Sequence, residues 1–171
     1  MLTSGFVHAG LLHLGFNTLA LWQLAPEVEA VMGPWVFVAI YTLSQLSGAT
    51  AAFLLTDTVT LGASGAVFGM LGALAGYFFR NPMLENRNPQ LTLIVMVVVA
   101  SLSVGLVPSL QVDNTGHFGG LIAGLFLGFA MGPRFVVIRE PSISDGAMDL
   151  YNVRPGGVGV QAPRCQGRWD G

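Results

Sequence analysis

A serine between two glycines is the first residue pattern that could do chemistry. Ser64 lies in GASG, between Gly62 and Gly65, and an apolar run follows it. A serine hydroxyl is a weak nucleophile unless a neighbouring base accepts its proton. At the start of a helix, Ser64 would lie among backbone N–H groups that have no partner within the helix and can stabilise an oxyanion. The pattern therefore makes Ser64 a candidate nucleophile, although a serine among small residues is also common at helix–helix contacts.

Three further polar side chains interrupt apolar runs and could complete such a site. His117 is the candidate base, and His13 and Asn17 could donate hydrogen bonds to an oxyanion. His13 and Asn17 are four residues apart, so they share one face of a helix. Each residue alone also fits a plainer role, namely helix packing or an interfacial position, and the same holds for His8.

Composition indicates a membrane protein. Charged residues make up 9% of the 171 residues, and mean hydropathy is +0.66, whereas soluble domains carry about 25% charge. All seven basic residues are arginines, they form no basic patch, and no nucleic-acid partner is expected. A single cysteine, Cys165, excludes an intrachain disulfide framework. Asp57 and Asp113 resemble solvated loop residues, and we expect neither a metal nor a cofactor.

The hydropathy pattern predicts an all-α polytopic bundle with five transmembrane helices. Each predicted span has about the length that a helix needs to cross the hydrocarbon core, and helices satisfy every backbone polar group within the segment. Connections rich in Pro, Asn and Gly separate the spans. The predicted spans are about residues 5–25, 35–55, 63–80, 91–108 and 115–132.

The arginines predict an orientation. With five spans, Arg80, Arg87 and the five arginines after the last span all lie on one side, which the positive-inside rule makes cytoplasmic. The C-terminus is then inside, and residues 133–171, rich in Gly, Pro and Arg, are expected to be a mostly disordered cytoplasmic tail. Met1 would be outside, which suggests that one span upstream of it is missing.

Glycines explain how the polar residues could meet. Small residues let membrane helices approach closely. A stripe of glycines at helical spacing runs along 63–80, and Gly120 and Gly124 lie on the same face as His117. If the two stripes pack together, His117 is carried toward Ser64. All the candidate polar residues also fall in the outer half of the membrane, given the predicted orientation.

Three patterns, in this order, resemble those of the rhomboid family of intramembrane serine proteases. They are HLGFN at 13–17, GASG at 62–65 and HFGGLIAG at 117–124. The resemblance covers residues 1 to about 132 and implies a membrane core of six helices, of which this chain would hold five. It also implies cleavage of transmembrane protein substrates in the lipid bilayer.

The resemblance implies roles for particular residues. Ser64 is the nucleophile and His117 the base of a dyad, and Asn17, His13 and the backbone of the Ser64 turn, with Gly65, line the oxyanion region. Structural support is implied for Gly62, Gly120, Gly124, Phe68 and Glu29, the last as an acid in the loop after the first pattern.

Against the family pattern, we expect the first span and the long loop that follows it to be missing from this sequence. Where several relatives carry a tyrosine four residues after the serine, this chain has Phe68. A non-catalytic binder of client helices is therefore an alternative function. A small transporter is a weaker one, because the spans contain no charged group near the midplane.

Overall fold

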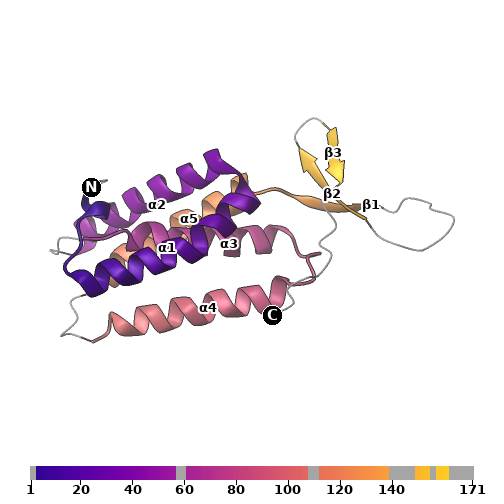
Figure 1. Cartoon of the computed structure of the whole chain (residues 1–171). Helices are drawn as coiled ribbons and strands as arrows, with labels where there is room; N and C mark the ends of the chain where they lie inside the picture. Colours follow the sequence, from indigo (N-terminus) through magenta and orange to yellow (C-terminus); the bar gives the residue numbers. More distant parts are fainter. Residues whose placement is uncertain (1–2, 57–60, 108–111, 139–148, 155–156, 162–171) are drawn as a thin grey trace. The chain divides into compact units, whose positions relative to one another are not determined.

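The computed structural model of the chain describes residues 3–56, 61–107, 112–138, 149–154 and 157–161. The chain divides into two units, Met1–Gly132 and Pro133–Gly171, and each is described here by itself. The first unit is an all-α bundle (Figure 1). Its elements are the 3₁₀ helix η1 (Thr3–Phe6) and the helices α1 (Leu11–Met32), α2 (Pro34–Leu55), α3 (Ser64–Arg80), α4 (Arg87–Val104) and α5 (Asn114–Met131).

The first helix differs from the predicted span at both ends. Residues 3–10 hold η1 and an irregular stretch, and α1 continues through Pro26 to Met32 rather than giving way to a loop at residue 26. The continuation has a packing reason, since Val28 and Met32 are one helical turn apart and both are buried. Gly33, at φ 84°, then ends α1, and Pro34 begins α2 directly.

The fourth helix is also shifted relative to the prediction. It begins at Arg87 instead of about residue 91, because Pro89 lies in its first turn, where no N–H is needed for a helical bond. It ends before Gly105. Ile94 is the one residue of α4 that is buried, and most of its other apolar side chains are exposed.

The third helix is the centre of the bundle. Every residue from Gly65 to Phe78 is buried. A helix that is apolar on all sides is stable only when other helices surround it, and α1, α2, α4 and α5 all contact α3. Because α3 begins at Ser64, the surrounding helices also determine where that hydroxyl lies.

The α3–α5 contact depends on glycine. A Cβ built on Gly120 would overlap the carbonyl oxygen of Gly65, and one on Gly124 would overlap the carbonyl oxygen of Gly69. One turn further on, Gly128 meets the backbone of Ala73 in the same way. The two glycine stripes therefore lie backbone against backbone, which is the arrangement that their spacing predicts.

Arginines satisfy helix ends at the opposite end of the bundle from Ser64. Arg80 donates to the carbonyl oxygens of Phe129 and Ala130 in the last turn of α5, and its guanidinium lies 5.8 Å from the centre of the Phe129 ring. The Nε of Arg87 donates to the carbonyl oxygen of Phe78 at 3.1 Å. Carbonyls in the last turn of a helix lack intrahelical donors, so these arginines serve as caps.

Two of the described helices, α2 and α4, are long and apolar enough to cross a membrane by length and composition. The central helix has 17 residues. In α1 and α5, polar residues and the small residues that allow close packing lower the mean hydropathy. The site and the packing that supports it therefore weaken the usual hydropathy signal.

The second unit contains three short strands, β1 (Phe135–Ile138), β2 (Asp149–Arg154) and β3 (Gly157–Gln161). They form an antiparallel sheet in the order β1-β2-β3, with Phe135 opposite Asn152 and an irregularity at Tyr151/Asn152. The sequence predicts a mostly disordered tail here. The strands fall on short runs rich in valine, a residue that favours strands, between the Gly- and Pro-rich segments.

The glycine contact gives a direct test of the packing. Gly124→Ala should lower the midpoint of thermal unfolding in detergent, because its Cβ would overlap the Gly69 carbonyl, and overpacking costs about 1–3 kcal/mol. Gly15→Ala is the matched control: Gly15 also lies in a helix, but a Cβ there meets nothing within 4 Å. The control should be neutral or stabilising. Equal midpoints for the two variants would contradict the close α3–α5 approach.

Candidate active site

The Ser64 turn is tied to the N-terminal segment. Ser64 is the first residue of α3 and is half-buried. Gly62 precedes it at φ 107°, a conformation that favours glycine. The Gly62 N–H donates to the carbonyl oxygen of Ser4 at 2.9 Å. A Cβ at Gly62 would also lie 2.8 Å from Cε1 of His13. Both the backbone angle and the space therefore require glycine at this position.

The first turn of α3 leaves specific donors open. The Ala66 N–H donates to the side-chain oxygen of Gln45 at 3.2 Å, and the Val67 N–H donates to the Ala63 carbonyl at 3.0 Å. Within the described part of the chain, the N–H groups of Ser64 and Gly65 have no acceptor. Helix N-termini favour negative charge, so two unpaired amides lie beside the Ser64 hydroxyl, where an oxyanion would form.

His117 lies beside the face of α3 that carries Ser64. Its ring is buried and stacks on the ring of Phe68, with centroids 4.2 Å apart and planes 7° apart. Phe68 follows Ser64 by one helical turn, so the imidazole lies on the Ser64 side of α3. The close approach of Gly120 to the Gly65 backbone brings α5 to that turn. The structure therefore places the candidate nucleophile and the candidate base on one surface.

Among the described residues, no carboxylate forms a hydrogen bond with the imidazole of His117. Nδ1 of His117 is buried and has no hydrogen-bond partner among the residues that the structure describes. Asp113, which the sequence suggests is a loop residue, instead caps α5: its side chain accepts from the Thr115 N–H at 2.9 Å. This arrangement fits a pair of Ser64 and His117 without a third member. Asp57 lies outside the described residues.

His13 contacts the Ser64 turn from α1, and Asn17 lies one helical turn further along the same helix. The His13 ring lies against Gly62 and meets His8 edge to face, with centroids 5.3 Å apart. Asn17 is one of three buried residues of α1, and its Nδ2 donates to the His13 carbonyl at 2.9 Å. A primary amide has two N–H donors, so one remains for a ligand. This hydrogen bond also orients the amide of Asn17.

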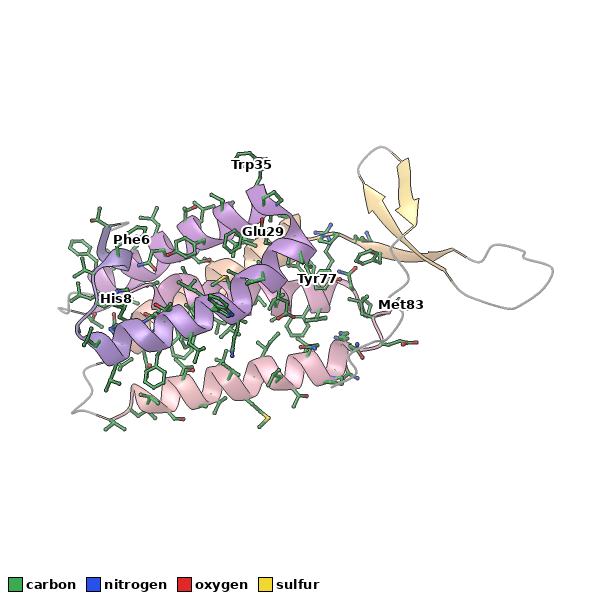
Figure 2. All side chains as sticks on the ribbon, in the orientation of Figure 1. Phe6, His8, Glu29, Trp35, Tyr77 and Met83 are labelled. Carbon is green, nitrogen blue, oxygen red and sulfur yellow. The ribbon has the colours of Figure 1, made fainter. Side chains whose placement is uncertain are left out.

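Glu29 is not brought to the site. It lies in the last turn of α1 rather than in a loop, with its side chain exposed, and its backbone carbonyl accepts from Gly33. Figure 2 shows Glu29 and His8 at opposite ends of the bundle. The hydrogen bonds of the described residues give the Glu29 carboxylate no supporting contact. The expectation that Glu29 lies in a loop was wrong, because the burial of Val28 and Met32 extends α1 past it.

Gln45 is a site residue that the sequence analysis missed. It lies in the middle of α2, is 3% exposed, and donates from Nε2 to the Gly62 carbonyl at 3.2 Å while accepting from Ala66. The sequence did indicate this residue, because a glutamine inside an apolar span is costly and is therefore a functional candidate. Among the described residues, no cluster of three His, Cys, Asp or Glu side chains could hold a metal ion.

Comparison with known proteins relates the chain to one family. The rhomboid domain family matches residues 1–134. The chain is 39% identical over 132 residues to Rhomboid protease GluP of Bacillus subtilis (strain 168), covering 77% of this chain and 26% of that protein. It is 39% identical over 131 residues to RHOMBOID-like protein 5 of Arabidopsis thaliana, covering 74% of this chain and 41% of that protein.

A fungal relative extends further along the chain. Rhomboid-type serine protease 2 of Emericella nidulans is 31% identical over 164 residues, covering 91% of this chain and 31% of that protein. The chain thus spans about a quarter to two fifths of the length of these three relatives. The match covers the whole helical unit, including α1, the Ser64 turn and α5. This chain belongs to the rhomboid family, and its first unit is a rhomboid-type membrane helix bundle.

Proposed function

We propose that this protein is an intramembrane serine endopeptidase with Ser64 as nucleophile and His117 as general base. The observation that carries the proposal is the stacking of His117 on Phe68, one turn from Ser64. Among the described residues, the backbone amides of Ser64 and Gly65 have no acceptor. Two of the relatives, Rhomboid protease GluP and Rhomboid-type serine protease 2, are named as proteases, which supports this function.

The proposed reaction begins with attack by Ser64 Oγ on the carbonyl carbon of a substrate peptide bond. His117 takes the hydroxyl proton as the C–O bond forms. The oxyanion accepts hydrogen bonds from the backbone amides of Ser64 and Gly65 and from the remaining N–H of Asn17. His13 lies against the same turn and completes the polar wall of the site.

Collapse of the intermediate breaks the C–N bond, and His117 returns its proton to the leaving amine. Water then gives a proton to His117 and attacks the acyl-enzyme ester, which releases the second product and restores the Ser64 hydroxyl. Phe68 holds the imidazole plane by stacking and contributes no proton. Because His117 Nδ1 lacks a carboxylate partner among the described residues, ring packing substitutes for the orienting acid of a triad.

The proposed substrates are membrane proteins. A serine at the N-terminal end of a bundle helix can receive only an extended backbone, so a substrate helix must unwind at the cut. We propose that the protein spans the cell membrane several times and that its C-terminus is cytoplasmic, with Arg80 and Arg87 at the cytoplasmic ends of α3 and α4. Ser64 is then near the opposite surface.

Covalent labelling tests the nucleophile. A fluorophosphonate should label the wild-type protein in detergent at Ser64, and Ser64→Ala should abolish both labelling and peptide cleavage, because the variant lacks the proposed nucleophile. Ser44→Ala is the matched control, since its hydroxyl is buried without a hydrogen-bond partner in the described residues. Equal cleavage by wild type and Ser64→Ala would reject the mechanism.

A folded wild-type protein that fails to label would instead favour the non-catalytic binder of client helices. Client capture by crosslinking would then remain in Ser64→Ala, because binding needs no nucleophile.

Removing the amide of Asn17 tests the oxyanion contact. Asn17→Ala should lower the cleavage rate by about 10²–10³-fold, the usual loss for one such donor. Thr18→Ala, an exposed neighbour on α1, should change the rate little. Thermal unfolding of both variants measures the structural contribution, since Asn17 also bonds the His13 carbonyl. A rate for Asn17→Ala within twofold of wild type would remove Asn17 from the site.

The single cysteine tests the orientation. If the tail is cytoplasmic, a membrane-impermeant maleimide added to intact cells should leave Cys165 unmodified and should modify it after permeabilisation. Cys165→Ser provides the background, because it leaves the chain without a thiol. Modification in intact cells to the permeabilised level would reverse the proposed topology.

A further inference from the structure

A buried amide on α2 joins the two ends of the turn that carries Ser64. Gln45 is 3% exposed, and its side chain bonds the Gly62 carbonyl through Nε2 and the Ala66 N–H through Oε1, both at 3.2 Å. Burying an unpaired amide is costly, and here both ends of the group are paired. The two partners lie on either side of Ser64 in the sequence, two residues away in each direction.

The backbone closes around this amide because two glycines leave room for it. A Cβ at Gly5, in η1, would lie 3.0 Å from both Cδ and Nε2 of Gln45. A Cβ at Gly65 would lie 3.3 Å from Oε1. The N-terminal segment and α3 thus contact the same side chain. The Gly62 N–H bond to Ser4 joins these two segments directly.

The bonding pattern selects which amides of the first turn stay open. A helix N-terminus offers several unpaired N–H groups, and Gln45 occupies the one from Ala66. The amides of Ser64 and Gly65 remain unpaired among the described residues. The bond to Gly62 fixes the other side of the turn, including the residue against which the His13 ring rests.

From this geometry we infer that Gln45 is a positioning residue for the nucleophile: it holds the Ser64 turn so that the hydroxyl and two open amides face one substrate carbonyl. The inference rests on the proposed function of Ser64. A residue that served helix packing alone would resemble Ser47, also on α2, whose hydroxyl donates to the Gly119 carbonyl of α5 at 2.9 Å. Ser47 links two helices, and no hydrogen bond joins its side chain to the described residues of the Ser64 turn.

The first measurement compares two variants of the full chain in detergent. Gln45→Met keeps an unbranched side chain of similar length and removes both hydrogen bonds, and Ser47→Ala removes the α2–α5 bond. The second-order rate constant for fluorophosphonate labelling of Ser64 should fall about 10–100-fold in Gln45→Met, because small displacements of a reacting group cost about that much. Ser47→Ala should label within about twofold of wild type once rates are normalised to the folded fraction.

The second measurement does not depend on activity. Amide hydrogen exchange in the peptide that contains residues 62–66 should be at least several-fold faster in Gln45→Met, because the Ala66 N–H loses its acceptor. Exchange there should be unchanged in Ser47→Ala. Exchange in the last turn of α3 reports global loosening and should stay equal in both variants.

The outcomes separate the inference from the proposed function. Slower labelling with faster local exchange supports the positioning role. Labelling of Gln45→Met equal to that of Ser47→Ala, with wild type reactive, overturns it and leaves the protease proposal standing. Unchanged amide exchange at residues 62–66 in Gln45→Met would show that the hydrogen bonds of Gln45 do not hold the turn. That result also overturns the positioning role. A folded wild type that never labels rejects the protease proposal and the positioning role together, whatever the exchange shows.

Discussion

The backbone contact between α3 and α5 is the constraint on which the rest of the bundle depends. Gly120 and Gly124 approach the carbonyls of Gly65 and Gly69 so closely that one added methyl group would overlap them. This contact sets the distance between the helix that begins with Ser64 and the helix that carries His117. In lipid, no hydrophobic force drives one apolar helix onto another. Dispersion between closely fitting backbones must therefore supply much of the association, and glycine is the residue that permits it.

Close packing leaves polar groups inside an apolar bundle, and the fold pairs several of them. The Asn17 amide bonds the His13 carbonyl one turn away, and Gln45 bonds two groups of the Ser64 turn. The buried Nδ1 of His117, in contrast, has no partner in the described part of the chain. An unpaired polar atom in a protein interior costs free energy. Stacking on Phe68 holds the ring of the proposed base in place.

The sequence predicted the features that depend on spacing. The three patterns around Asn17, Ser64 and His117, and the glycine faces between them, follow from helical periodicity, and the family comparison confirms the rhomboid bundle. Features that depend on which helix faces which could not be obtained in this way. Gln45 was visible as a polar residue in an apolar span, but its partners are 17 and 21 residues away across a helix–helix contact. The length of α1 depended on the burial of Val28 and Met32, which also requires the tertiary arrangement.

The central position of α3 explains why so much support converges on one serine. A helix end buried without partners would be unstable, and α3 is buried along almost its whole length. At its C-terminal end, Arg87 satisfies the Phe78 carbonyl. At its N-terminal end, complete capping would remove the donors that an oxyanion needs, whereas no capping would let the first turn fray. One side chain from α2 satisfies a single amide and one carbonyl, and two amides remain open beside the hydroxyl. Partial capping is thus the arrangement that keeps a buried helix end both ordered and able to stabilise an oxyanion.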